Sequence, residues 1–174
     1  DATKDCLSIA GISINEVDMI TVTWMPKLMI REQYLKNALT NDNRLTFLIN
    51  DLDLIKNMFD AENTIRKKLN YNGRIECLNH HLCHLASTYY SSGFDDALVV
   101  SYDGVGEIDT MAIAIGEHGI ISVKENGNKY PHSLGLLYAA VTHYLGWKYC
   151  YDEGIVMGLA SLGDPHAIIP GKDI

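Results

Sequence analysis

The stretch that decides the fold runs from residue 97 to residue 124 and reads ALVVSYDGVGEIDTMAIAIGEHGIISVK. It holds three short runs rich in Val and Ile, which we expect to be strands, at Ala97–Tyr102, Thr110–Ile115 and Ile120–Lys124. Glycine-containing turns separate them, at Asp103–Glu107 and Gly116–Gly119. Strands joined at such short spacing predict an antiparallel meander.

Helical patterns flank this predicted sheet. On its N-terminal side a helix ends before Gly11, a strand covers Met19–Trp24, and Arg31–Asn70 is helical. Within the last segment, apolar residues recur at intervals of three and four, which predicts one stripe facing a core: Leu45, Leu48, Leu52, Ile55 and Phe59. We further expect a short strand at Arg74–Leu78 and helices at His80–Ser91, Ser133–Tyr144 and Asp152–Leu162.

Composition sets broad limits on function. The 174 residues are 47% hydrophobic and 21% charged, which is typical of a globular domain. The net charge of −8 disfavours a nucleic-acid partner, since such binding depends on Lys and Arg neutralising phosphates. No apolar run approaches the length of a membrane span, and the four cysteines lack CxxC spacing, so we expect a cytoplasmic protein with reduced thiols and no membrane partner.

A histidine cluster, His80, His81 and His84, is the strongest candidate site. His80 and His84 lie four residues apart, so on a helix they project from one face, as two imidazoles must to share a metal ion. His81 with His84 is the alternative pair, and two ordinary histidines are an equally good interpretation. Asp103, at the end of a predicted buried strand, is the best candidate for a third ligand, although Asp-Gly is also a common turn pair. Mixed His and carboxylate ligation suits iron, manganese or zinc.

The turn after this strand, Asp103–Glu107 (DGVGE), is a second candidate. Gly104 and Gly106 would let backbone N–H groups approach a phosphate or a carboxylate closely. A plain turn without a ligand is the better interpretation of these glycines alone. Glu107 is either functional or solvent-facing.

Three longer runs together resemble the carbamoyltransferases of the nodulation and antibiotic-biosynthesis type, which are O-carbamoyltransferases. They read NHHLCHLASTYYSSGFDDALVVSYDGVGE from residue 79, PHSLGLLYAAVTHYLGW from residue 131 and DEGIVMGLASLGDP from residue 152. The match covers about Arg74–Pro165, in order and with fitting spacing, whereas residues 1–73 fit only loosely as a strand plus helices. Two departures are Ile155, where relatives often carry lysine, and Ser161–Gly163, where they often have PYG.

The resemblance implies an α/β fold related to actin, sugar kinases and the tRNA threonylcarbamoyl-transfer proteins, with a mixed sheet, the meander and flanking helices. It also implies that residues 1–174 are a fragment of the N-terminal, actin-like domain, with 74–174 bearing the motifs. The family's metal ligands correspond to His80, His84 and Asp103, and a further acidic ligand and the first phosphate motif are expected outside the chain. The cofactor-binding residues would be Asp103, Gly104, Gly106 and Glu107, whose turn would line the phosphate region.

The chemistry that the resemblance implies starts from carbamoyl phosphate and ATP, which form a carbamoyl-adenylate in a second domain. The carbamoyl group then passes to a hydroxyl of a small molecule beside the metal. His81 is the candidate general base for that hydroxyl. We expect the fragment alone to be inactive, and exposed apolar surface to favour homo-oligomers. The alternatives are a tRNA threonylcarbamoyl-transfer relative and a metal-free, inactive α/β module.

Overall fold

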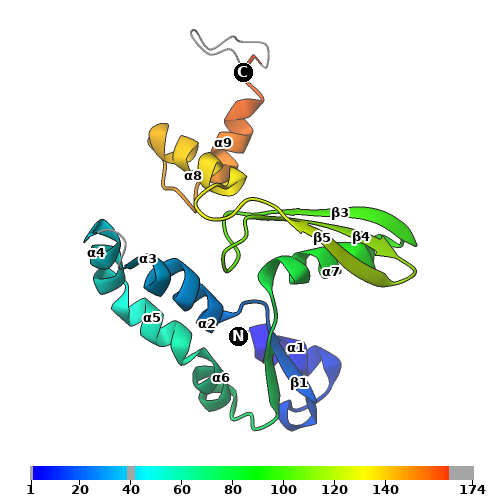
Figure 1. The fold of residues 1–174 in the computed structure, drawn as a ribbon. Coiled ribbons are helices and arrows are strands. Elements are labelled where there is room, and N and C mark those ends of the chain that lie inside the picture. Colours follow the sequence, from blue (N-terminus) through cyan, green and yellow to red (C-terminus); the bar gives the residue numbers. More distant parts are fainter. Residues whose placement is uncertain (1, 39–41, 165–174) are drawn as a thin grey trace.

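The computed structural model describes residues 2–38 and 42–164 and shows a mixed α/β chain (Figure 1). Its first half is mostly helical. The elements there are α1 (Ala2–Ala10), a 3-10 turn (Ile14–Glu16), β1 (Met19–Val22), α2 (Pro26–Met29), a π-helix (Ile30–Leu35), α3 (Lys36–Ala38), α4 (Asp42–Asn50), α5 (Leu52–Phe59) and α6 (Ala61–Leu69). The second half holds β2 (Arg74–Cys77), α7 (His80–Ser92), β3 (Asp96–Tyr102), β4 (Met111–Glu117), β5 (Ile120–Asn126), α8 (Leu134–Tyr144) and α9 (Glu153–Ala160).

The predicted meander is confirmed. β3, β4 and β5 pair antiparallel in that order, with Val99 opposite Ala114 and Gly116 opposite Ile121. The β4–β5 turn is tighter than predicted, because the strand continues through Glu117 and only two residues, His118 and Gly119, make the turn. Their φ values of 50° and 78° are those of a two-residue hairpin turn.

Parallel pairing occurs in a separate place. β1 and β2 pair in parallel, with Ile20 opposite Ile75, across the long helical segment that joins them. Within the described residues this pair and the meander form two sheets, so the single mixed sheet that we expected is wrong in this respect.

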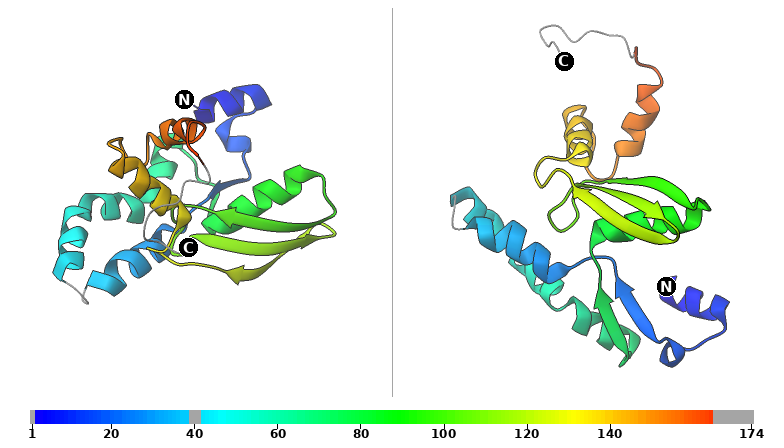
Figure 2. Two further views of the ribbon diagram at one scale, coloured as in Figure 1. Left: turned by 90° about the horizontal axis from the view of Figure 1, so that it is seen from above. Right: turned by 45° about the vertical axis from the view of Figure 1, so that its right-hand side comes forward.

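The core of the second half lies between α7 and one face of the meander (Figures 1 and 2). Its buried side chains are Leu85, Tyr89, Val99, Ala112 and Ala114. The small strand residues let the helix approach closely. A Cβ on Gly116 would lie 2.4 Å from the Tyr89 ring, so the glycine is required by packing and not by a turn.

The opposite face of the meander is much more open. Leu98 is 71% exposed and Tyr102 is 60% exposed, and both alternate along β3 with the buried Val99 and Ser101. β3 is also an edge strand of its sheet. An open apolar face beside an unpaired edge strand usually marks a surface that another chain or segment covers.

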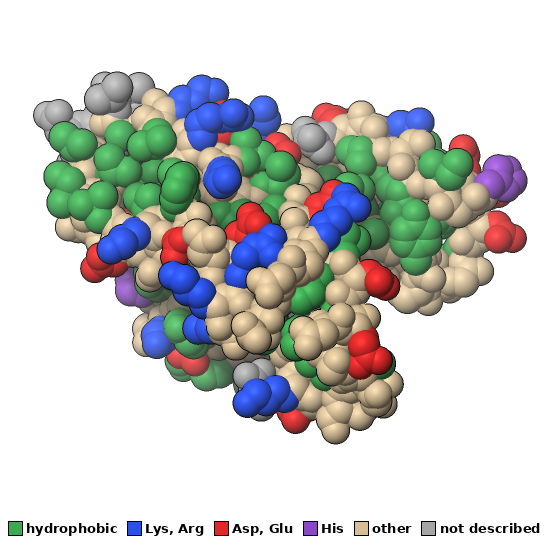
Figure 3. Space-filling model, turned by 90° about the horizontal axis from the view of Figure 1, so that it is seen from below, with side chains coloured by type: hydrophobic (Ala, Val, Ile, Leu, Met, Phe, Trp, Pro, Cys, Tyr) green, Lys and Arg blue, Asp and Glu red, His purple; other side chains and the backbone are tan. Residues whose placement is uncertain are grey.

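The stripe predicted on the N-terminal helices is only partly covered. Leu45, Leu52 and Phe59 are 43%, 54% and 66% exposed, and α5 has no buried residue. Seen from below, hydrophobic side chains accordingly gather on the side of the molecule where α3–α5 lie (Figure 3). Within residues 2–38 and 42–164, no helix has both the length and the apolar character to cross a bilayer.

Candidate metal centre

His80, His84 and Asp103 come together where α7 begins and β3 ends. His80 Nε2 lies 2.6 Å from Asp103 Oδ2 and 3.0 Å from His84 Nε2, and His84 Nε2 lies 3.2 Å from the same carboxylate oxygen. The three atoms therefore form a small triangle. Metal–ligand bonds of about 2.0–2.2 Å place adjacent ligand atoms roughly 2.9–3.5 Å apart, so this spacing is close to that of a shared divalent ion.

Local sequence explains why the two histidines share a face. Asn79 is the N-cap of α7, and its side-chain oxygen accepts the Leu82 N–H at 2.9 Å. The helix therefore starts at His80, and the next residue on the same face is His84. At the other end, Gly93 ends α7 with a φ of 75°.

Asp103 is fixed by its own backbone and by α8. Its N–H donates to the Thr110 carbonyl at 3.0 Å, and its carbonyl accepts the Ser133 hydroxyl at 2.7 Å. One carboxylate oxygen, Oδ1, accepts the Gly104 N–H, which leaves Oδ2 for the histidines. Ser133 also caps α8 by accepting the Leu136 N–H, so one side chain both begins this helix and holds Asp103.

The electrostatics of the triangle favour a cation at its centre. Burial raises the pKa of Asp103, but hydrogen bonds from His80 and the Gly104 N–H outweigh it and hold the pKa below its ordinary value of 3.8. His80 Nδ1 faces the Thr23 carbonyl at 3.0 Å, and a carbonyl only accepts, so Nδ1 carries a proton. Nε2 then either donates a second proton to Asp103 or offers its lone pair to a metal ion that replaces that proton. A carboxylate and an imidazole lone pair that converge in this way need a proton or a metal ion between them.

His81 has a different environment from its two neighbours. It is 2% exposed, its Nε2 donates to the Asp109 carbonyl at 2.7 Å, and its Nδ1 accepts the Ser101 hydroxyl at 2.8 Å. With both ring nitrogens engaged and the ring packed against Gly106, His81 cannot take a proton from a substrate without breaking a buried bond. This geometry argues against the general-base role that we expected for His81.

The turn after β3 also differs from the expectation of a phosphate cradle. The Gly104 N–H donates to Asp103 Oδ1 and the Gly106 N–H donates to the Asp109 carbonyl at 2.8 Å, so both amides are already used. Glu107 is 2% exposed, and its carboxylate bonds Met25, Asn79 and His80. In this geometry Glu107 is a structural bridge and does not face a ligand.

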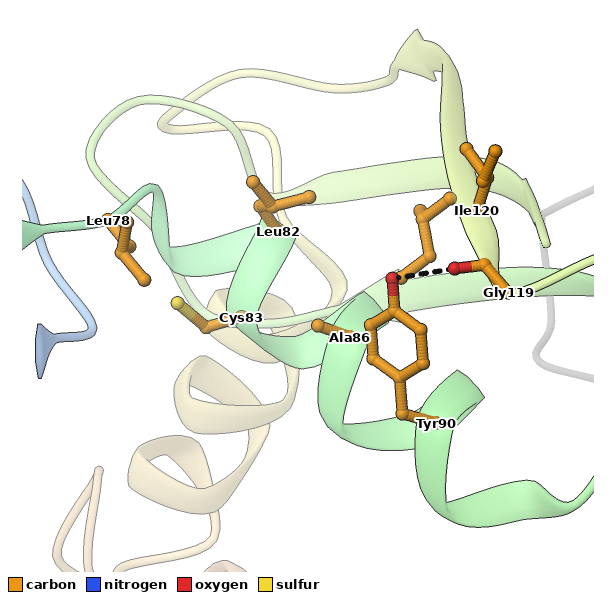
Figure 4. A pocket seen from close by; sticks show the side chains of 8 residues that line it. Leu78, Leu82, Cys83, Ala86, Tyr90, Gly119 and Ile120 are labelled. Atoms are coloured by element: carbon orange, nitrogen blue, oxygen red, sulfur yellow. Dashed lines mark hydrogen bonds between the residues drawn. The ribbon is translucent and has the colours of Figure 1, made fainter.

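One hollow borders the triangle, and a second is lined in part by α7 but by no residue of the triangle. An open groove of about 640 Å³ borders Asp103 and is lined by Tyr102, Asp103, Gly104, Leu134, Gly135, Leu137, Tyr138 and Val141. The other, of about 400 Å³, lies on the outer side of α7 against the β4–β5 hairpin, where the Tyr90 hydroxyl bonds the Gly119 carbonyl (Figure 4). Cys83 lines the latter hollow and takes no part in the triangle, and all four cysteines are unpaired.

Comparison with known proteins identifies the family of this chain. Residues 1–172 match the family described as Carbamoyltransferase N-terminus. The chain belongs to this family.

Two relatives match more than nine-tenths of the chain, and a third matches about half of it. An uncharacterised protein of Synechocystis sp. is 34% identical over 170 residues, which is 92% of this chain and 27% of that protein. Nodulation protein NolNO of Sinorhizobium fredii is 30% identical over 171 residues, covering 97% of this chain and 23% of that protein. Nodulation protein NolO of Bradyrhizobium diazoefficiens is 39% identical over 88 residues. The chain thus spans about a quarter of the length of the first two relatives.

Some residues of the site were not singled out from sequence. Thr23 and Trp24 border His80, and Gly135 lies against the Asp103–Gly104 backbone. The first two lie at the end of the predicted strand Met19–Trp24, which in the structure already ends at Val22, and they carry no motif of their own. Gly135 follows a helix cap, and a glycine in the first turn of a helix is a usable sign of close approach.

Proposed function

We propose that this chain is the metal-bearing part of an O-carbamoyltransferase. In this proposal the complete enzyme moves a carbamoyl group from carbamoyl phosphate, through an ATP-derived carbamoyl-adenylate, to a hydroxyl of a small molecule. The observation that carries the proposal is the His80–His84–Asp103 triangle, found in a chain of the carbamoyltransferase family.

The three residues would hold one divalent ion: iron, manganese or zinc. Such an ion orients a bound phosphate and stabilises the charge that develops as the adenylate leaves. Asp103 would contribute carboxylate Oδ2, since its Oδ1 already accepts the Gly104 N–H. His80 would contribute Nε2, where the ion replaces any proton, while Nδ1 keeps its proton on the Thr23 carbonyl. His84, whose side chain is 49% exposed, is the most accessible of the three from solvent. A further acidic ligand from outside this chain would complete the coordination.

The groove beside Asp103 is the proposed place for the substrates. Its volume of about 640 Å³ is in the range of small-molecule sites. Its exposed tyrosines, Tyr102 and Tyr138, offer ring faces and hydroxyls to a sugar or a nucleoside. The close approach of α8 at Gly135 brings this groove directly against the metal ligand.

The rest of the enzyme follows from the same proposal. We expect an actin-like domain, to which this α/β chain contributes the meander and its flanking helices, and a separate adenylate-forming domain. Dependence on ATP and carbamoyl phosphate fits the cytoplasm, and the net charge of −8 favours a small-molecule acceptor over tRNA. The open apolar edge of β3 supports association into homo-oligomers.

A two-step assay of the full-length protein tests the proposal. Pyrophosphate release from ATP in the presence of carbamoyl phosphate reports adenylate formation, and labelled carbamoyl incorporation into candidate sugars reports transfer. His84→Ala should keep pyrophosphate release and lose transfer, since only the transfer step uses the metal-bearing part. Absence of both activities in the wild-type protein would contradict the carbamoyltransferase proposal, and equal transfer by His84→Ala would contradict the metal's role.

A further inference from the structure

His80 is enclosed by a segment that lies far from it in the sequence. The chain after β1 passes over the ring, so that the Thr23 carbonyl accepts the Nδ1–H at 3.0 Å and the Trp24 ring lies 4.2 Å away between centroids. Figures 1 and 2 show this β1–α2 connection beside the start of α7. The Thr23 carbonyl keeps a proton on Nδ1, and the two contacts together set which way the ring faces, with Nε2 toward Asp103.

Glu107 ties this segment to the helix. One carboxylate oxygen accepts the Met25 N–H at 2.8 Å and the His80 N–H at 3.2 Å, and the other accepts the Asn79 side-chain amide at 3.0 Å. The backbone carbonyl of Glu107 also accepts the Gln33 amide at 2.6 Å. Three segments therefore meet on one residue that is 2% exposed.

The chemistry of this junction requires a carboxylate. All three groups that face the side chain are donors, and an ionised carboxylate is an acceptor at both oxygens. An amide in its place would direct an NH₂ group toward at least one of these donors. The anion also lies at the N-terminus of α7, a helix of 13 residues, where the helix dipole favours negative charge.

We propose that Glu107 is a positioning residue for the metal ligand His80, clamping Met25 to the start of α7 so that Thr23 and Trp24 hold the imidazole with Nε2 toward Asp103. This inference rests on the proposed metal site. The Glu107 carboxylate itself bonds Met25, Asn79 and the His80 backbone, so its effect on the metal would pass through the position of the His80 ring. Loss of an outer partner of a metal-bound histidine typically weakens metal binding by about 10–100-fold.

The test measures Co²⁺ binding to the full-length protein by competition with a chromophoric chelator, together with the visible absorption of the bound Co²⁺. Glu107→Gln should raise the Co²⁺ dissociation constant by about 10–100-fold and change the absorption spectrum, since His80 is then free to turn. Glu117→Gln, on the exposed end of β4, makes the same change in net charge. Tyr71→Phe removes buried hydrogen bonds to Val17 and Arg74, remote from the triangle. Both controls should bind Co²⁺ as the wild type does.

Each outcome decides between the two proposals. If the wild type binds Co²⁺ and Glu107→Gln binds it with the same dissociation constant and the same spectrum, the positioning role is wrong and the metal site stands. Equal weakening in Tyr71→Phe would also overturn it, because general loosening would then explain the effect. If the wild type binds no Co²⁺, the metal site and this inference both fail. Should Glu107→Gln not fold, Glu107→Asp keeps the charge at a shorter reach, and its spectrum must differ from that of the wild type.

Discussion

Substituting Gly135 by alanine tests the packing of α8 against the metal ligand. A Cβ at this position would lie 2.6 Å from the Gly104 nitrogen, 2.7 Å from its Cα and 2.9 Å from the Asp103 carbonyl carbon. These are backbone atoms, so no side chain can turn aside. An ordinary contact of about 3.4 Å requires the start of α8 to move by about 0.8 Å.

That movement has a cost that can be worked out from neighbouring contacts. Overpacking of this kind costs about 1–3 kcal/mol. The Ser133–Asp103 hydrogen bond, now 2.7 Å, would lengthen and lose about 1 kcal/mol. The better helix propensity of alanine returns about 0.5–1 kcal/mol. The net loss in free energy of unfolding should therefore be about 1–3 kcal/mol, with weaker metal binding through the displaced Asp103.

Urea unfolding followed by tryptophan fluorescence measures this loss. Gly158→Ala in α9 is the matched control, because a Cβ there meets nothing within 4 Å, and it should stabilise by about 0.5–1 kcal/mol. If Gly135→Ala is stabilised to the same degree as Gly158→Ala, the close contact between α8 and the Asp103–Gly104 backbone is wrong.

Three further predictions concern the core, an alkaline titration and the open edge. Leu85 is 1% exposed, so Leu85→Ala leaves a cavity in the core and should lower the free energy of unfolding by about 2–5 kcal/mol in the same urea experiment. A loss below about 1 kcal/mol would contradict the core described between α7 and the meander. Burial, and then the charge of Asp51, raise the pKa of Tyr34 above its ordinary value of 10.0. The folded state therefore keeps a proton that the unfolded chain loses, so stability should fall as pH rises through about 10, and Tyr34→Phe should lessen this fall. Leu98→Lys, at a position 71% exposed on β3, should reduce self-association in sedimentation velocity, and unchanged association would exclude this edge as the contact.

Local patterns predicted the meander well because its strands are neighbours in sequence. The predicted end of the strand that became β4 was wrong, because Gly116 was assigned to the following turn. In the structure Gly116 lies within β4, against the Tyr89 ring. That position depends on how α7 packs on the sheet, which sequence periodicity does not contain. The parallel pairing of β1 with β2 was also missed, because it joins segments about fifty residues apart and local patterns do not show which distant segments pair.

The stripe on the N-terminal helices shows another limit of pattern reading. Spacing predicts which side chains share a face, and Leu45, Leu52 and Phe59 do recur as predicted. Whether a face is buried depends on what packs against it, and within the described residues little does. The chain also breaks there into short helices with a π-helix between α2 and α3, which periodicity did not indicate.

In the site, helical spacing correctly put His80 and His84 on one face, and the end of a strand put Asp103 beside them. His81 was harder because its role depends on which side of α7 faces the sheet. That information was present in the sequence, since His81, Leu85 and Tyr89 recur at intervals of four and are the buried residues of the helix. A histidine that continues an apolar stripe is better interpreted as part of the core than as a general base.

The metal content of the purified full-length protein is the most direct test of the central claim, that His80, His84 and Asp103 hold a divalent ion. Elemental analysis of the wild type should find about one iron, manganese or zinc ion per chain. Asp103→Asn and His84→Ala should lose most of it, whereas Tyr71→Phe should retain it. Wild-type protein that remains metal-free after incubation with each of the three ions, or variants that retain the full content, would contradict the claim.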